Sequence, residues 1–300
     1  MRSKPPDARG TLVHGVGKDR CSGRRGRWPA AAATFLVTLL ATSLPAMETL
    51  RVCSDPNNLP FSNEAGQGFE NVLAEIVAEE TDAHVSYTWW AQRRGFIRNT
   101  LDAGACDLVI GVPADFELAE TTRPYYRSTY VFVYAPGPGD PVRSIRDPRL
   151  RDLKIGVHLT GDDGNNPPPA HALGQLGVVD NVVGFMIYGD YREPNPPARL
   201  IDAVASGTID IAAAWGPTAG YFARRMTPRL ELQPITDTGF AGVPFSFSIA
   251  MGVRRGDIEF RNEIQAAIDR READIKRVLR DYDVPLLADN EQAAARESSP

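Results

Sequence analysis

The chain lacks the short motifs that mark the common enzyme classes. It contains no Gly-x-Ser-x-Gly, P-loop, His-Glu-x-x-His or Gly-x-Gly-x-x-Gly sequence. Histidine is scarce: after residue 46 only His84, His158 and His171 remain, and none has the spacing of a metal-ligating pair. We therefore predict a protein that is not an enzyme, with no catalytic residue, no cofactor and no metal site.

Basic residues are also few over most of the chain. Residues 1–46 hold eight Lys or Arg and two Asp of the chain's 33 basic and 38 acidic residues, so the remainder carries 25 basic and 36 acidic residues, a net charge of −11. This balance argues against nucleic-acid binding, which needs a basic face. No segment after residue 46 is apolar enough to span a membrane.

The only long apolar run lies near the start of the chain. It covers residues 30–44, follows the basic leader and ends in Leu44-Pro45-Ala46. We predict a signal peptide over 1–46 and a periplasmic protein. An uncleaved anchor is the alternative, but the run is short for one. Arg24-Arg25 lacks the apolar residues expected after a twin-arginine signal, which favours general secretion.

Cysteine is rare, and its use agrees with export. Cys21 belongs to the predicted leader, which leaves Cys53 and Cys106. An even pair in an oxidising compartment is most simply a disulfide. Two free buried thiols are the alternative interpretation.

One pattern occurs twice. Each copy has the end of an amphipathic helix, a Gly, and a short apolar strand opened by Asp; the copies contain Gly104-Ala105-Cys106-Asp107 and Gly207-Thr208-Ile209-Asp210. The glycines are 103 positions apart (207 − 104), about the length of a small domain. A helix followed by an apolar strand is half of a βαβ unit, so we predict two α/β lobes with a cleft between them.

The predicted elements give the lobes their boundaries. Lobe 1 covers 47–135 and returns as a hinge crossing and closing helix at 243–287, lobe 2 covers 136–242, and 288–300 form a flexible tail. The first crossing is placed at the Pro- and Gly-rich segment 136–141. Strands are expected at 50–53, 85–89, 107–111, 130–134, 154–157, 182–185, 209–214, 230–235 and 245–253, and helices at 69–77, 96–101, 170–176, 200–204 and 257–279.

Candidate cleft residues follow from these elements. Open α/β sheets bind ligands beyond the carboxyl ends of their strands, where several aromatic residues are expected. Segment 161–166 faintly resembles a calcium loop but lacks the bidentate acid, so a turn with backbone N–H groups facing a ligand is the better interpretation. The candidate cleft residues are Asn57, Phe61, Trp90, Asp115, Thr160, Gly161, Asp162, Tyr188 and Trp215.

The order of elements resembles the periplasmic solute-binding proteins of the polar amino-acid type (family 3). More specific motifs resemble the MoxJ/XoxJ group, the binding-protein homologues associated with PQQ-dependent methanol dehydrogenases; they lie at 53–62, 68–71, 188–191, 194–199 and 214–221. The resemblance implies a two-lobed, type II periplasmic-binding-protein fold, in which each lobe is a mostly parallel sheet flanked by helices and two strands form the hinge.

The departures from amino-acid receptors matter as well. Those receptors place an Arg after the third strand to hold the ligand carboxylate, whereas this chain has Gly111-Val112-Pro113-Ala114-Asp115 there, and Trp215 stands where they place an Asp. The resemblance therefore implies an accessory, activating or maturation partner of a PQQ-dependent methanol or alcohol dehydrogenase. The alternative is a receptor that delivers a small, aromatic or quinone-like solute to an ABC permease.

Overall fold

The computed structural model describes residues 48–159, 166–186 and 192–288. The predicted signal peptide and nearly all of the predicted tail lie outside these ranges, as do the candidate residues Thr160, Gly161, Asp162 and Tyr188. Within the described ranges, no helix is long and apolar enough to cross a membrane.

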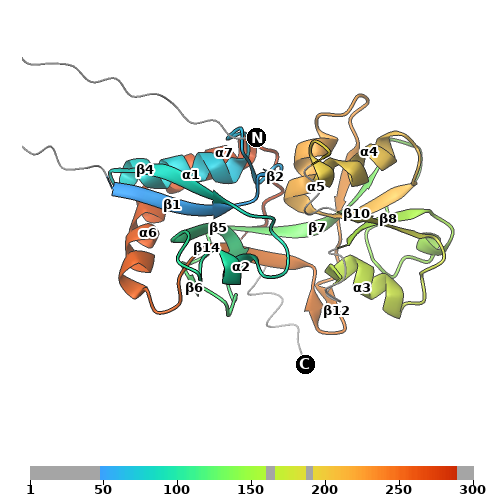
Figure 1. Cartoon of the computed structure of the whole chain (residues 1–300). Helices are drawn as coiled ribbons and strands as arrows, with labels where there is room; N and C mark the ends of the chain where they lie inside the picture. Colours follow the sequence, from blue (N-terminus) through green and yellow to red (C-terminus); the bar gives the residue numbers. More distant parts are fainter. Residues whose placement is uncertain (1–47, 160–165, 187–191, 289–300) are drawn as a thin grey trace, which may run out of the picture. The chain divides into compact units, whose positions relative to one another are not determined.

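The described strands form one connected mixed sheet in the order β4-β1-β5-β14-β7-β10-β8-β9, with β11 paired to β7 and β6 to β14 (Figure 1). Two short hairpins, β2-β3 and β12-β13, stand apart from it. The strands are β1 Glu48–Ser54, β2 Asn57–Asn58, β3 Ser62–Asn63, β4 Ala83–Trp89, β5 Leu108–Pro113, β6 Glu120–Thr121, β7 Tyr126–Tyr134, β8 Ile155–Leu159, β9 Val182–Met186, β10 Ile211–Trp215, β11 Glu231–Pro234, β12 Gly239–Phe240, β13 Val243–Pro244 and β14 Ser246–Val253.

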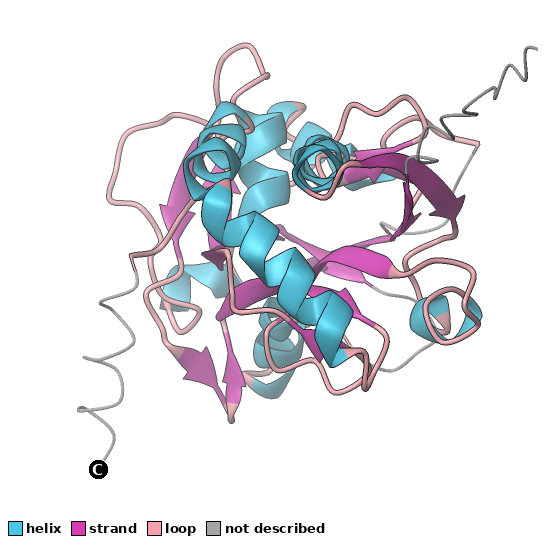
Figure 2. Cartoon of the chain, turned by 90° about the vertical axis from the view of Figure 1, so that its left-hand side faces the viewer, coloured by secondary structure: helices cyan, strands magenta, loops and turns pink. Residues whose placement is uncertain are grey.

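Helices cover the sheet near both of its ends. Figure 1 shows α1, α6 and α7 beside β1 and β4, and α4 and α5 beside β10. Figure 2 looks from the side of the first group and shows helices in front of the strands. The helices are α1 Phe69–Glu80, α2 Phe96–Asn99, α3 Pro168–Gln175, α4 Arg199–Ala205, α5 Gly216–Ala223, α6 Ile258–Arg270 and α7 Glu272–Asp281, with short 3-10 turns η1 Pro148–Arg151 and η2 Pro196–Ala198.

The repeated sequence pattern corresponds to a repeated structure. β1 pairs in parallel with β4 and β5, and β8 pairs in parallel with β9 and β10. Gly104 and Gly207 have φ of 69° and 68°, left-handed values that glycine adopts without strain. The N–H of Asp107 donates to the carbonyl of Arg51 at 2.8 Å, and that of Asp210 to the carbonyl of Lys154 at 2.9 Å. The two copies of the sequence pattern therefore fold in the same way.

Strand β7 connects the two repeats. Tyr126–Thr129 pair antiparallel with β14, whereas Tyr130–Tyr134 pair antiparallel with β10. The change of partner falls within β7, so the described strands make one sheet. The lobe boundaries drawn from the sequence stay predictions.

The core follows the same division. Around β1, β5 and β14 the apolar faces of α1, α6 and α7 meet, with Phe69, Leu73, Ile264 and Leu279 fully buried among them. The stripe of α1 recurs every three to four residues, which is why this face turns inward. Two further clusters cover the faces of β10 and β8. Leu59 comes from the loop after β1 but packs in one of these clusters, with Leu200 and Ile201.

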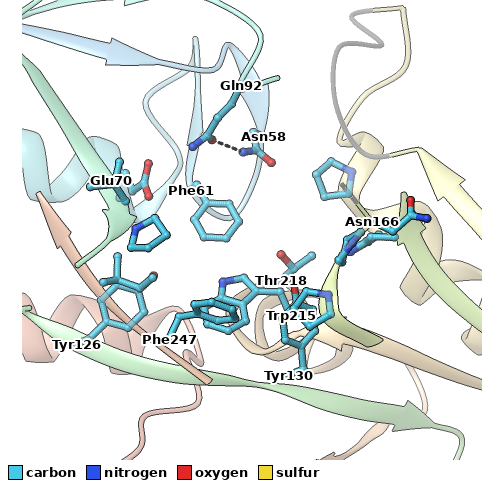
Figure 3. Close-up of a pocket in the computed structure, with 18 residues that line it drawn as sticks. Asn58, Phe61, Glu70, Gln92, Tyr126, Tyr130, Asn166, Trp215, Thr218 and Phe247 are labelled. Atoms are coloured by element: carbon cyan, nitrogen blue, oxygen red, sulfur yellow. Dashed lines mark hydrogen bonds between the residues drawn. The ribbon is translucent and has the colours of Figure 1, made fainter. Parts of the chain in front are cut away.

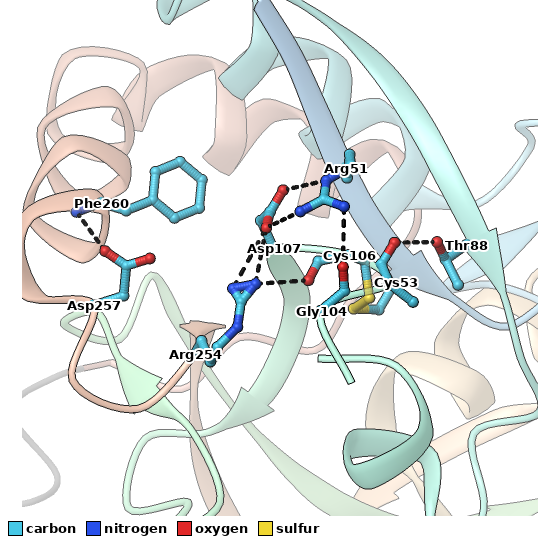
Figure 4. A network of polar contacts seen from close by, with 10 residues as sticks. Arg51, Cys53, Thr88, Gly104, Cys106, Asp107, Arg254, Asp257 and Phe260 are labelled. Carbon is cyan, nitrogen blue, oxygen red and sulfur yellow. Dashed lines mark hydrogen bonds and ion pairs between the residues drawn. A yellow bond between two sulfur atoms is a disulfide. The ribbon is translucent and has the colours of Figure 1, made fainter. Parts of the chain in front are cut away.

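The disulfide between Cys53 and Cys106 is confirmed, with Cα atoms 5.5 Å apart (Figure 4). It joins the end of β1 to the segment before β5. Beside it, the Asp107 carboxylate binds the Arg51 guanidinium, at 2.7 Å from Nε and 2.6 Å from Nη2, and Nη2 of Arg254 at 3.0 Å. These contacts fasten β1, β5 and the end of β14 together.

Two helix predictions were wrong. The predicted helix 257–279 is two helices, α6 and α7, which are separated at Arg271, where φ is −107° and ψ is 17°. The Arg271 side chain bonds to Asp274 at 2.7 Å and lies 3.3 Å from Glu79 of α1, contacts that favour the break. The predicted helix 96–101 ends at Asn99, and the fully buried Leu101 lies in the following turn.

The residues that follow α7 pack on α5, a helix of the second repeat. The rings of Tyr282 and Tyr221 stack with centroids 5.7 Å apart. At Gly220, a Cβ would lie 2.0 Å from the carbonyl oxygen of Asp283, so only glycine allows this approach. The Asp283 carboxylate is 3.5 Å from Nη1 of Arg225.

Candidate functional site

A cavity of about 400 Å³ lies between the two repeats (Figure 3). It meets the carboxyl ends of three strands, because Pro113 ends β5, Trp215 ends β10 and His158 is next to the end of β8. This is the place where open α/β sheets bind ligands. The described lining residues are Asn58, Phe61, Glu70, Gln92, Gly111, Val112, Pro113, Tyr126, Tyr130, His158, Asn166, Pro167, Pro168, Pro197, Trp215, Thr218, Phe247 and Ile249.

Aromatic rings form much of the wall. The centroid of Trp215 is 5.2 Å from that of Tyr130 and 5.9 Å from that of Phe247, and Figure 3 shows the three side chains gathered on one side of the cavity. Phe61 lies opposite them, with its ring 5.3 Å from that of Phe69. Such packing leaves ring faces and edges, not charges, as the main surface that a ligand meets.

One carboxyl group interrupts this apolar wall. Glu70 is in the first turn of α1 and is only 8% exposed, yet it lines the cavity. Burial, together with the nearby Asp55 carboxylate, raises the pKa of Glu70 from 4.5 to about 8. No hydrogen bond or ion pair of its side chain is found within the described residues. A Cβ at Gly111 would lie 2.2 Å from Oε1 of Glu70, so the glycine provides the room for this carboxyl.

A histidine faces the same cavity from β8. His158 is 4% exposed, and burial lowers its pKa from 6.5 to about 4. It bonds to the backbone of Pro197, where only the carbonyl is available because proline has no N–H. Its Nε2 has no hydrogen-bond partner among the described residues. The ring is therefore neutral, with Nδ1 as the donor and Nε2 as a free acceptor.

Polar groups close one side of the cavity. Nδ2 of Asn58 donates to Oε1 of Gln92 at 3.0 Å, and both residues line the cavity. The adjacent Asn57 points elsewhere: its Nδ2 donates to the carbonyl of Glu193 at 2.7 Å, and its Oδ1 accepts the N–H of Asn195 at 3.1 Å. The loop after β1 is thus bonded to the segment before α4.

The structure brings some of the candidate residues together and separates others. Phe61 and Trp215 line the cavity. Asn57 lies next to it and bonds across to the second repeat. Trp90 is 43% exposed, and Asp115 is exposed at the end of β5; neither lines the cavity. A ligand contact at Trp90 or Asp115 stays a prediction.

Sequence reasoning missed Glu70 and His158. Glu70 opens an amphipathic helix, where an acidic residue is common for reasons of helix polarity alone. The signal that was available is Gly111, a glycine inside a predicted apolar strand, which indicates a close approach by another group. His158 follows the predicted strand 154–157 and lies one residue before the end of β8. The first four residues of β8 are all buried, so no alternation of polar and apolar residues marked its inward position.

The fold and the cavity define a protein of the periplasmic-binding-protein-like α/β class. An ancestral cationic amino acid solute-binding protein has the same fold, with a TM-score of 0.61 and 22% identity over 78% of this chain and 95% of its own. No protein-family model matches the sequence.

More specific relatives identify the family. The chain is 31% identical over 255 residues to protein MoxJ of Methylorubrum extorquens, covering 81% of this chain and 83% of MoxJ. It therefore belongs to the MoxJ family of periplasmic binding proteins. The solved structure of the periplasmic binding protein XoxJ from Methylobacterium extorquens AM1 is 36% identical, with a TM-score of 0.64 over 80% of this chain and 100% of XoxJ. MxaJ from Methlophaga aminisulfidivorans MPT is 27% identical, with a TM-score of 0.69 over 79% of this chain and 100% of MxaJ.

Proposed function

We propose that this chain is a non-enzymatic periplasmic accessory protein that activates, or assists the maturation of, a PQQ-dependent methanol or alcohol dehydrogenase. Its membership of the MoxJ family supports this role. The motifs that carry the resemblance occur in both repeats, which supports a function of the whole chain.

The observation that carries the proposal is the absence of a cation in the described wall of the cavity. None of the described lining residues is Lys or Arg. The segments 160–165 and 187–191, which lie outside the described ranges, contain no Lys or Arg in their sequences. A free amino acid would have to bury its carboxylate without a charged partner, which costs several kcal/mol. The chain therefore has the fold of an amino-acid receptor, but the described wall of its cavity lacks the cationic residue that would bind the ligand carboxylate.

Hinge motion belongs to the same proposal. β7 carries the chain from the first repeat to the second, and the chain returns before β14, which pairs with β5, β6 and the first half of β7. We place the two lobe boundaries near 135 and 242. The cavity opens when the bonds between Asn57 and the segment 193–195 break. In that state it receives a segment of the partner enzyme, as clefts of hinged proteins receive their ligands.

Isothermal titration of the mature protein into a purified PQQ-dependent methanol dehydrogenase tests the association. We expect saturable binding, and a higher specific activity of the dehydrogenase when the two proteins are produced together. The matched variant is Trp215→Ala, which removes a ring from the cavity, with the exposed Trp90→Ala as control. Co-purification with a permease and an ATPase, and never with a quinoprotein, would contradict the proposal.

The aromatic wall favours one alternative, a receptor that delivers a small aromatic or quinone-like solute to an ABC permease. A cavity of about 400 Å³ is of the size that holds such a ligand. A thermal-shift screen separates the two functions, because a solute present at 100 times its dissociation constant adds about 2.7 kcal/mol to the free energy of unfolding. A stabilising quinone or aromatic acid that leaves dehydrogenase binding absent would favour the receptor.

A further inference from the structure

Among the described residues, the Glu70 carboxyl is a buried ionisable group for which no partner is found. It is more than nine-tenths buried, it lines a cavity, and the described residues give it no cation and no hydrogen-bond donor. Buried carboxyl groups in proteins are normally paired or hydrogen-bonded. Figure 3 shows the carboxyl of Glu70 directed toward the ring of Phe61, into the space between the walls.

The start of α1 does not satisfy this carboxyl. The N–H groups of Phe69 and Glu70 donate to the carbonyls of Pro60 and Phe61 at 2.8 and 2.9 Å. The side chain of Asn71 accepts the N–H of Gly68 at 3.0 Å. These three backbone donors are thus occupied, and the buried Nδ2 of Asn71 has no hydrogen-bond partner among the described residues. No hydrogen bond found in this turn reaches the Glu70 carboxyl, which is left facing the cavity.

The rest of the wall suits a cation with an apolar body. The rings of Phe61, Tyr126 and Trp215 line the cavity, and aromatic faces attract cations. The Nε2 of His158 offers a second acceptor and no donor. We propose that the cavity binds a protonated primary amine on an apolar body, with the ammonium group donating to the Glu70 carboxylate and the body lying among the aromatic rings.

This chemistry has two sources, a free aralkylamine and the lysine side chain of a protein segment. Both present an ammonium group with N–H donors on an apolar stem. This inference concerns the same cavity as the proposed function, and it rests on the proposed function only if the amine is a lysine side chain of the partner enzyme. The amine-binding experiment contains no dehydrogenase, so its failure would contradict this inference and not the association with the dehydrogenase. A failure to bind the dehydrogenase would likewise leave the binding of a free amine unaffected.

Isothermal titration with 2-phenylethylamine and the neutral 2-phenylethanol, at pH 8, tests the proposal. We expect the amine to bind at least about tenfold more tightly than the alcohol, the preference of a charge-assisted hydrogen bond. Glu70→Gln keeps the shape of the side chain and abolishes the preference. Glu75→Gln, on the exposed side of the same helix, retains it.

The proton balance gives a second readout. Because burial raises the pKa of Glu70 to about 8, amine binding at pH 7 releases the Glu70 proton, and the affinity rises about tenfold from pH 6 to pH 7 and less steeply from pH 7 to pH 8. The titratable groups that face Glu70 are Asp55 on the loop after β1, Tyr87 on β4, Tyr125 before β7 and Tyr126 on β7. The neutral His158, with its pKa near 4, does not titrate in this window. Heats measured in phosphate and in Tris report the released proton.

Three results would contradict amine binding at Glu70. Equal binding of amine and alcohol, or an amine preference unchanged in Glu70→Gln, overturns the proposal, as does a pH-independent affinity. If Glu70→Gln fails to fold, Gly111→Ala tests the same point, because its Cβ occupies the space of the carboxyl oxygen. Nα-acetyl-lysine amide against Nα-acetyl-norleucine amide separates the sources: a tenfold preference here with weak binding of 2-phenylethylamine assigns the site to a lysine side chain.

Discussion

The side chain of Asn57 accepts a hydrogen bond from the backbone N–H of Asn195 at 3.1 Å. The same side chain donates to the neighbouring carbonyl of Glu193 at 2.7 Å, so one amide satisfies both a donor and an acceptor of a segment 136 positions away in the sequence. Leu59, two residues further on, packs in the core of the second repeat. The loop after β1 therefore holds the two repeats together at the mouth of the cavity.

Replacing Asn57 by Ala removes both hydrogen bonds. We expect the free energy of unfolding to fall by about 1–2 kcal/mol, the usual contribution of two such bonds. The amide hydrogen of Asn195 loses its acceptor and exchanges faster with solvent, which hydrogen-exchange mass spectrometry of the peptide containing it measures.

The matched control is Asn57→Asp, which keeps an oxygen for the N–H of Asn195 but loses the donor to Glu193. We expect protection of Asn195 to survive in this variant. Equal protection in the wild type and in Asn57→Ala would show that the bond does not hold the loop.

The disulfide between Cys53 and Cys106 closes a loop with a sequence separation of 53. In the chain-entropy model such a loop adds about 4 kcal/mol to stability. Replacing both cysteines by Ser should lower the free energy of unfolding in urea by about this amount. Dithiothreitol should bring the wild type to the level of the double variant and leave that variant unchanged; a wild type insensitive to reduction would contradict the assignment.

Trp215 supports the aromatic wall by packing between Tyr130 and Phe247. Trp215→Ala removes both ring contacts and opens a void, and we expect a loss of about 2 kcal/mol in a urea titration. Trp90→Ala changes a side chain that is 43% exposed, and its effect should stay within about 0.5 kcal/mol. Similar losses in the two variants would disprove the packing role of Trp215.

Glu70 should make stability depend on pH. Its pKa in the folded state, about 8, lies above the ordinary value of 4.5, so the folded chain holds a proton that the unfolded chain releases between these values. Stability is therefore fully present below about pH 4.5 and decreases as the pH rises through 8, with a slope of up to about 1.4 kcal/mol per pH unit. Urea titrations from pH 6.5 to 8 measure this slope, and Glu70→Gln should flatten it.

His158 gives a slope of the opposite sign at lower pH. Burial lowers its pKa to about 4 from 6.5, so the unfolded chain binds the extra proton between these values. Its contribution is fully present above pH 6.5 and decreases as the pH falls through 4. The two slopes oppose one another below pH 6.5. We expect His158→Gln to steepen the fall of stability with rising pH between pH 4.5 and 6.5, an effect that a chemical denaturation series at those pH values detects.

The repeated architecture was predictable because its signals are local. Gly104 and Gly207 mark the same turn, and the following Asp opens the same kind of strand, so each half of the pattern needs only about ten neighbouring residues. The disulfide was predictable because only two cysteines remain after the leader. The break at Arg271 was not, since a continuous apolar stripe crosses it and the contacts with Glu79 and Asp274 that favour it are partly distant in sequence.

The cavity was only partly predictable for a similar reason. Phe61 and Trp215 follow strands, where the ligand-binding end of a sheet is expected. Glu70 lies in a helix, and its direction depends on the space left by Gly111 of β5, a neighbour that the helix pattern does not contain. Trp90 and Asp115 also follow strands, but side chains after a strand end turn toward solvent as readily as toward the ligand.

Tyr126 and Tyr130 stand on the same face of a single strand, four positions apart, and both border the cavity. Their backbones, however, are bonded to different neighbours, β14 for the first and β10 for the second. Any bend of this strand between positions 129 and 130 changes the separation of the two phenol rings directly. The width of the cavity therefore depends on the curvature of β7. A ligand that separates the two rings by moving their Cα atoms also bends the backbone of this strand.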